Sequence, residues 1–75
     1  MTFGERLKMF RELAGLSQGE LARKAGIHRA TITAVENGRQ ANVNVFTARS
    51  LARALEISID MLVGDSESEL EPAVA

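Results

Sequence analysis

The stretch LSQGELARKAGIHRATITAVENG, Leu16–Gly38, decides the fold. Ser17 is followed three residues later by Glu20, which is the spacing of a capping box at the start of a helix. Gly26 and Gly38 can each adopt the left-handed conformation that ends a helix without strain on a Cβ atom. The stretch therefore predicts one helix over about residues 18–25, a tight turn, and a second helix over about residues 29–37.

Each of these two helices has a narrow apolar face. In the first it comprises Leu21, Ala22 and Ala25, and in the second Ile32 and Val35. Two helices this short cannot bury enough surface against each other, so the rest of the chain must supply a core. The pattern is that of a helix-turn-helix, whose second helix is a candidate reader of a DNA groove.

A further helix is predicted before this unit. Thr2 and Glu5 form another capping box, so the helix runs from Phe3 to about Ala14, and Gly15 ends it. Its apolar residues recur at helical spacing and are expected in the core: Phe3, Leu7, Phe10 and Leu13.

Two more helices are predicted after it. Residues 39–44 are rich in side-chain amides and are expected to form a loop, with Asn44 capping a helix that runs to about Leu55. Ser58 caps a short last helix, Ile59–Val63, closed by Gly64. The expected inward residues of the longer helix are Ala48, Leu51, Ala52 and Leu55. Residues 1–64 are therefore predicted to be one all-α domain, a compact five-helix bundle.

Charge is unevenly distributed along the chain. The formal net charge is −1, but residues 1–64 hold nine basic and six acidic residues, a balance of +3. The last eleven residues, 65–75, hold the other four acids, which alternate with serine and leucine, and the single proline. We expect this acidic tail to be disordered. A mildly basic body is compatible with DNA binding.

Several function classes are disfavoured. The chain has no cysteine and one histidine, His28, so we expect no metal site and no cofactor. No apolar run reaches the ~20 residues of a membrane span, and we expect a cytoplasmic protein. No nucleophile–base set or carboxylate pair indicates an enzyme.

Several spaced motifs resemble a known family. They are Ser17-Gln18, Glu20-Leu21-Ala22, Gly26-Ile27, Thr31-Ile32, Glu36-Asn37-Gly38, Leu51-Ala52 with Leu55, and Ile57-Ser58 with Leu62. Together they are similar to phage-repressor/Cro-type helix-turn-helix domains, the xenobiotic-response-element family of bacterial regulators. The resemblance implies a lambda-repressor-like five-helix domain that binds operator DNA as a dimer. The chain departs from the family pattern at Gly19, at Val43, where proline is frequent, and at His28, where the cap is usually Ser or Thr.

The outward strip of the predicted second helix supplies the base-reading candidates. If Ile32 and Val35 point inward, the neighbouring strip consists of Arg29, Ala30, Thr33, Ala34 and Asn37. An arginine can bind guanine through two hydrogen bonds, and Ala or Thr methyl groups can contact a thymine methyl. The resemblance implies base reading at Arg29, Ala30 and Thr33, and we add Ala34. The alternative is an ordinary solvated helix face.

Contacts to DNA phosphates are expected from residues beside this strip. Gln18 lies in the first turn of its helix, where free amides attract anions; the alternative is a solvated side chain behind the cap. The remaining candidates are Asn37, Arg39, Gln40, Asn42 and Arg11. Asn44 has a competing role as a helix cap.

Arg11 and Glu36 each fall on an apolar register, four residues after Leu7 and Ile32. A buried charge needs a partner, so we predict that Arg11 and Glu36 form an ion pair between the first helix and the reading helix. The resemblance implies the same pair. The alternative is that the two side chains reach water separately.

Two functions remain open. The first is a sequence-specific transcriptional regulator, more in keeping with a repressor, bound as a homodimer to a partly palindromic site in double-stranded DNA. The dimer seam would use Ile59, Met61 and Val63, with Leu62 in the core. The alternative is an antitoxin or adaptor module whose main partner is a protein, such as a toxin.

Overall fold

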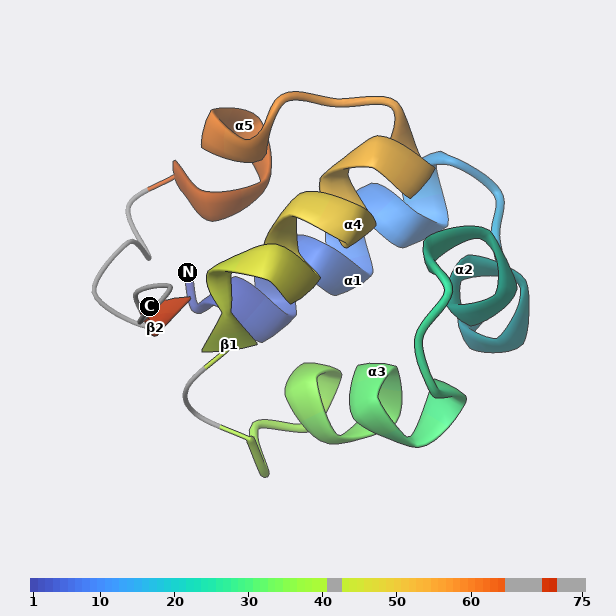
Figure 1. The fold of residues 1–75 in the computed structure, drawn as a ribbon, viewed down its shortest axis with the longest axis horizontal. Helices are drawn as coiled ribbons and strands as arrows, with labels where there is room; N and C mark the ends of the chain where they lie inside the picture. The colour runs from blue at the N-terminus through green and yellow to red at the C-terminus, as the bar shows by residue number, and fades with distance from the viewer. Residues whose placement is uncertain (41–42, 65–69, 72–75) are drawn as a thin grey trace.

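The computed structural model describes residues 1–40, 43–64 and 70–71, and these contain five helices and two very short strands (Figure 1). The elements follow in the order α1 (Phe3–Leu13), α2 (Gln18–Ala25), α3 (Arg29–Glu36), β1 (Val43–Asn44), α4 (Val45–Leu55), α5 (Ile59–Val63) and β2 (Leu70–Glu71). The predicted all-α five-helix architecture is confirmed. The helix ends agree with the prediction except that Ala14 and Asn37 are C-caps rather than helical residues.

The helix ends are determined by local hydrogen bonds of the predicted kind. Both capping boxes are formed: the Ser17 Oγ accepts from the Glu20 amide at 3.0 Å, and the Glu20 carboxylate accepts from the Ser17 amide at 2.8 Å. Thr2 and Glu5 repeat this geometry in α1. Gly26 ends α2 in the left-handed conformation, with φ 70°. These contacts satisfy backbone amides that would otherwise lack a partner at the helix starts.

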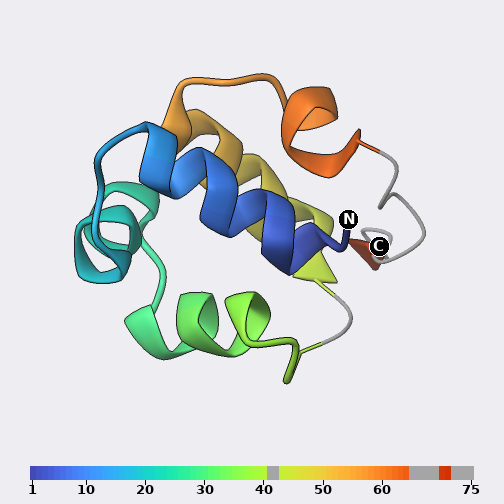
Figure 2. The ribbon, with the colours of Figure 1, turned by 180° about the vertical axis from the view of Figure 1, so that it is seen from behind.

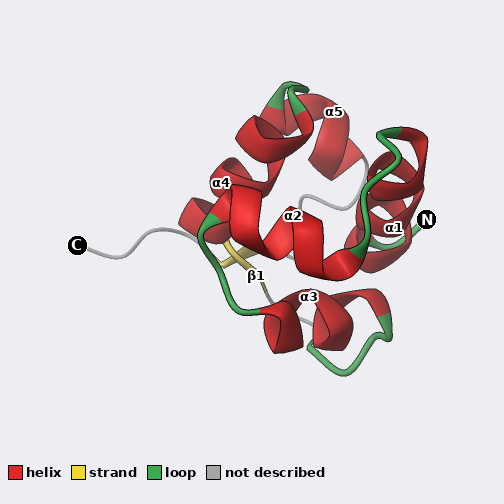
Figure 3. Ribbon diagram, turned by 90° about the vertical axis from the view of Figure 1, so that its right-hand side faces the viewer, coloured by secondary structure: helices red, strands yellow, loops and turns green. Residues whose placement is uncertain are grey.

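The helices close into a ring of contacts. α1 packs on α3 and α5, α2 packs on α3 and α4, and α4 packs on α5. Figure 2 shows the same arrangement from behind, with α3 along one margin and α5 at the opposite margin. Viewed from the side in Figure 3, α3 lies below the other helices, so one side of it faces away from the bundle. The fold therefore holds α3 from one side only.

The core lies inside this ring. Predicted core residues that are fully or almost fully buried include Phe3, Leu7, Leu21, Ile32, Val35, Leu51 and Leu62. The prediction for Leu13 is wrong, because its side chain is 76% exposed. α1 ends at this residue, and after the turn at Gly15 it is Leu16 that packs against the core instead. Val63 is 6% exposed and belongs to the core, so its assignment to a dimer seam is also wrong.

The short strands were not predicted. Val43–Asn44 pairs in parallel with Leu70–Glu71, with Val43 opposite Leu70. Val43 is buried, so the segment expected to be a loop contributes a side chain to the core. For Leu70 and Glu71 the expected irregular chain is replaced by a strand. The rest of the predicted disordered tail, residues 65–69 and 72–75, lies outside the described residues.

Two close contacts attach α1 to the elements beside it. Gly4 is buried against the C-terminal end of α3, and a Cβ atom at this position would overlap the Val35 carbonyl oxygen. Arg6 donates from Nε to the Leu62 carbonyl at 3.0 Å and from Nη2 to the Met61 carbonyl. Arg6 thus satisfies carbonyls at the end of α5, which a helix of this length leaves without internal partners. Both contacts hold α1 against helices at opposite margins of the bundle.

Candidate functional site

The free side of α3 carries a shallow hollow open to solvent. It has a volume of about 420 Å³ and is lined by Arg29, Ala30, Thr33, Ala34 and Arg39. Four of these five are the base-reading candidates, so the structure brings that predicted set together in one place. Arg29, Ala30 and Arg39 are exposed, whereas Thr33 and Ala34 are half-buried. Three of the five lining side chains are small, those of Ala30, Thr33 and Ala34.

The charge of this hollow has one sign. Its lining residues comprise two arginines and no acid. The nearest acidic side chain of the same helix, Glu36, is directed inward and is 2% exposed. A concave surface lined by two arginines and three small side chains suits a polyanion that can approach closely.

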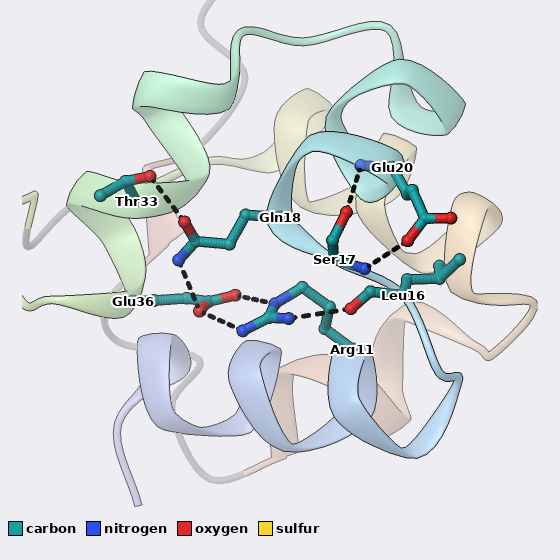
Figure 4. Close-up of polar contacts among 7 residues, drawn as sticks. All are labelled: Arg11, Leu16, Ser17, Gln18, Glu20, Thr33 and Glu36. Carbon is teal, nitrogen blue, oxygen red and sulfur yellow. Dashed lines mark hydrogen bonds and ion pairs between the residues drawn. The ribbon is translucent and has the colours of Figure 1, made fainter.

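Behind α3 lies the predicted ion pair, and it is bidentate (Figure 4). Arg11 Nε donates to Glu36 Oε2 at 2.8 Å, and Arg11 Nη2 donates to Glu36 Oε1 at 3.0 Å. The hydrogen bond to Glu36 raises the pKa of Arg11 above its usual value. Arg11 also donates from Nη1 to the Leu16 carbonyl at 2.8 Å. The pair therefore ties α1 to α3 and to the segment before α2, and the two side chains do not reach water separately.

A second pair of contacts extends this network to the hollow. Gln18 donates from Nε2 to Glu36 Oε1 at 3.1 Å, and its Oε1 accepts from the Thr33 hydroxyl at 3.0 Å. Figure 4 shows the resulting chain of Arg11, Glu36, Gln18 and Thr33 across α1, α2 and α3. From the sequence, Gln18 is predicted to contact a phosphate or to be solvated, and this bridge is not predicted. Gln18 and Thr33 are fifteen residues apart, and no local pattern links them.

Three of the phosphate candidates lie at or just after the end of α3. Asn37, Arg39 and Gln40 are exposed, and Asn37 is the C-cap of the helix. Arg39 lines the hollow, whereas Gln40 lines a separate cavity of about 190 Å³ near the start of α1. Asn42 lies outside the described residues. The Asn44 Oδ1 accepts from the Phe46 amide at 2.7 Å, so it caps α4 as predicted.

His28 precedes α3 and makes no side-chain capping hydrogen bond. Across residues 1–40, 43–64 and 70–71, no group of three metal-ligating side chains gathers in one place. Over the same part of the chain, no helix has both the length and the apolar character needed to cross a bilayer.

Known proteins resemble this chain in sequence and in fold. The HTH-type transcriptional regulator SinR of Bacillus subtilis (strain 168) is 31% identical over 68 residues, which are 91% of this chain and 60% of SinR. The immunity repressor protein of Bacillus phage phi105 is 35% identical over 65 residues, 87% of this chain and 44% of the repressor. The chain thus spans about half the length of these relatives.

A solved structure shares the arrangement of the helices. The crystal structure of the biofilm master regulator SinR in complex with DNA superimposes with a TM-score of 0.80 at 29% identity, covering 83% of this chain and 98% of that one. The lambda-repressor-like fold predicted from the sequence is therefore confirmed. A family model described as helix-turn-helix matches residues 7–62. The chain belongs to the helix-turn-helix family, as a DNA-binding domain of the phage-repressor/Cro or xenobiotic-response-element type.

Proposed function

We propose that this protein is a sequence-specific, double-stranded-DNA-binding regulator of transcription, acting as a repressor. The observation that carries the proposal is the hollow on the free side of α3, which is lined by small side chains together with Arg29 and Arg39. The similarity of the chain to SinR and to a phage immunity repressor supports the same function. These relatives are described as regulators, which favours regulation over the antitoxin alternative and over an enzymatic role.

In this proposal α3 lies in the major groove. Arg29, at the N-terminal end of α3, binds guanine through O6 and N7, worth about 1–3 kcal/mol of discrimination. Ala30 and Ala34 let the helix approach closely and place methyl groups against thymine. The side chain of Thr33, which lines the hollow, contacts a base edge.

The phosphate contacts flank the groove. Arg39, Asn37 and Gln40 are exposed after the end of α3, where they can bind the backbone of one strand. Gln18 can add a contact through the second proton of its amide nitrogen, because the first is donated to Glu36. Asn42 and Arg11 stay candidates for this role. Arg11 has its three donating nitrogens engaged inside the protein, so its contribution is chiefly to hold α3 in place.

Two copies are proposed to bind together on a partly palindromic site. One domain covers only a half-site, and half-sites about one helical turn apart, ~34 Å, place two α3 helices in successive major grooves. On α5, Met61 is 51% exposed and Ile59 is half-buried, and they are the candidates for the seam. Because its ligand is chromosomal DNA, we place the protein in the cytoplasm.

The test is selection of binding sites from a random duplex library at one fixed salt concentration, for the wild type and for Arg29→Ala. We expect the wild type to enrich one related half-site twice. Arg29→Ala should lose the preference for guanine at one position of each half-site, and keep the remaining positions. Enrichment of no common sequence would refute the proposal. In a separate titration of the selected duplex, affinity that does not weaken as salt rises would also refute it.

A further inference from the structure

The chain of hydrogen bonds behind α3 fixes which atoms donate, beginning at Glu36. Its side chain is 2% exposed, and both of its carboxylate oxygens accept from Arg11 at 2.8 and 3.0 Å. A carboxylate in this bidentate pair is ionised and carries no proton. Glu36 can therefore only accept hydrogen bonds, whichever neighbour faces it.

Gln18 is oriented by this acceptor. The atom of its amide that lies 3.1 Å from Glu36 Oε1 must be the nitrogen, because an amide oxygen has no proton to donate. The amide oxygen then points in the other direction, toward α3, and lies 3.0 Å from the Thr33 hydroxyl. The opposite orientation of this amide would place two acceptors against each other at Glu36.

Thr33 is left with one role. An amide oxygen only accepts, so the Thr33 hydroxyl must donate its single proton to Gln18. The lone pairs of Thr33 Oγ1 can still accept a hydrogen bond. This side chain is half-buried and lines the hollow of α3. Toward any ligand in that hollow, the oxygen is an acceptor without a proton to offer.

We infer that Thr33 is a specificity-determining residue that accepts but does not donate, held in this state by Gln18, and that it selects a base with an amino group in the major groove. The inference rests on the proposed function. In the major groove adenine offers N6–H₂ and cytosine offers N4–H₂, whereas guanine O6 and N7 and thymine O4 are acceptors. Each base pair carries one such amino group, on one strand only, so Thr33 favours the pair that places adenine or cytosine on the strand that it contacts. Gln18 is the positioning residue, although it need not touch that base.

The first experiment compares selected sites of the wild type, Thr33→Val and Gln18→Met. Thr33→Val keeps the shape of the side chain without the hydroxyl. The position of the site at which this variant loses the wild-type base preference is the position that Thr33 contacts. There the wild type should favour the base pair that presents its amino group to Thr33 over the reversed pair about fivefold, the value of a net hydrogen bond of about 1 kcal/mol. Gln18→Met frees the Thr33 proton, so this preference should fall to within about twofold, whatever happens to overall affinity. Thr33→Ser, the matched control, should retain it.

The second experiment needs no change at Gln18. The selected adenine is replaced by a purine without the exocyclic amino group, or the selected cytosine by its analogue lacking that group. Wild-type affinity should fall about fivefold more than the affinity of Thr33→Val, because both proteins experience the same weakened base pair and only one loses a hydrogen bond.

The outcomes separate the two proposals. A Gln18→Met variant, folded by circular dichroism, that keeps the wild-type preference overturns the inference alone, and so does a Thr33→Val variant that keeps this preference at every position of the site. An equal loss for wild type and Thr33→Val on the analogue overturns it as well. If no common sequence is enriched by the wild type, the proposed function fails and the inference fails with it.

Discussion

Removal of Arg11 should reveal how strongly the ion pair holds α3 to the bundle. In Arg11→Met the Glu36 carboxylate loses both hydrogen bonds from the guanidinium and keeps only the Gln18 amide at 3.1 Å. Its side chain is 2% exposed, so water replaces the lost partner only in part. A buried charge left without its partner costs about 3–5 kcal/mol.

The lower part of this range fits the geometry. The Arg11 side chain is 11% exposed, so its site lies near the protein surface and some water can enter when the guanidinium is gone. We therefore expect a loss of about 3 kcal/mol in the free energy of unfolding. For a domain of this size, each 1 kcal/mol corresponds to about 4–8 °C in Tm, so the melting temperature should fall by roughly 12–24 °C.

The double variant Arg11→Met/Glu36→Met gives the sharper result. With both charges removed, no buried charge is left unpaired, and an apolar pair of similar volume is often neutral. Two weaker losses remain: the Leu16 carbonyl and the Gln18 amide each lose a partner, at about 1 kcal/mol each. The double variant should therefore be more stable than Arg11→Met, although it carries one more substitution.

The assay is urea unfolding followed by circular dichroism, for wild type, both single variants and the double variant, with the exposed neighbour Glu12→Gln as the control. The midpoint and slope give the free energy of unfolding for each protein. The control should lie within about 0.5 kcal/mol of wild type. Additive losses, with the double variant the least stable of the four, would refute the reasoning, because they would mean that the two side chains act independently.

Three further predictions concern other parts of the domain. Gly4→Ala should lower stability by about 1–3 kcal/mol in the same urea assay, because the new methyl group overlaps the Val35 carbonyl oxygen. Gly19 occupies the same position of its own helix, but a Cβ atom there would lie 3.9 Å from Ser17 Oγ and 4.0 Å from Arg29 Cδ, so Gly19→Ala should be neutral or slightly stabilising. An equal effect of the two substitutions would disprove the close approach. Hydrogen bonds from Ser17 lower the pKa of Glu20 below its usual 4.5, so the ionised carboxylate stabilises the fold above pH 4.5 and this contribution disappears as pH falls through the lowered pKa. Glu20→Gln should therefore lose less stability than wild type between pH 7 and pH 3. Identical dependence of stability on pH in the two proteins would contradict the capping role. Arg39→Gln should weaken binding to all duplexes alike and reduce the slope of log affinity against log salt by about 1, whereas a loss confined to one base of the site would mean that Arg39 reads sequence instead.

Local features of this fold were predictable because their causes are local. The capping boxes at Thr2 and Ser17 and the left-handed turn at Gly26 involve residues within a few positions of each other, so their spacing alone predicts them. The Arg11–Glu36 pair was predictable for another reason. A charge on an apolar register must find a partner, and the chain offers two such charges of opposite sign.

Features that depend on how the helices pack were not predictable. Leu13 continues the apolar stripe of α1 by spacing, but it is the last residue of the helix and faces solvent. The close approach of Gly4 to Val35 and the bond of Arg6 to the end of α5 join residues 31 or more positions apart. Such contacts follow from the positions of whole helices, which helical periodicity does not give.

The candidate site shows both situations. The strip containing Arg29, Ala30, Thr33 and Ala34 follows from knowing which side of α3 is buried, and these residues do line one hollow. The link from Thr33 to Gln18 needs the angle between α2 and α3, and only the structure supplies it. The residues that form the surface were thus predictable, whereas the hydrogen bond that the Thr33 hydroxyl donates was not.

The central claim is that the free side of α3 contacts base edges in the major groove. Intermolecular nuclear Overhauser effects between the protein and its selected duplex test it most directly, because they report which protons lie within contact distance. We predict effects from the methyl groups of Ala30, Thr33 and Ala34 to major-groove protons, namely thymine methyl and cytosine H5. Effects only to minor-groove sugar protons, or only from side chains of α1 or α5, would contradict the account.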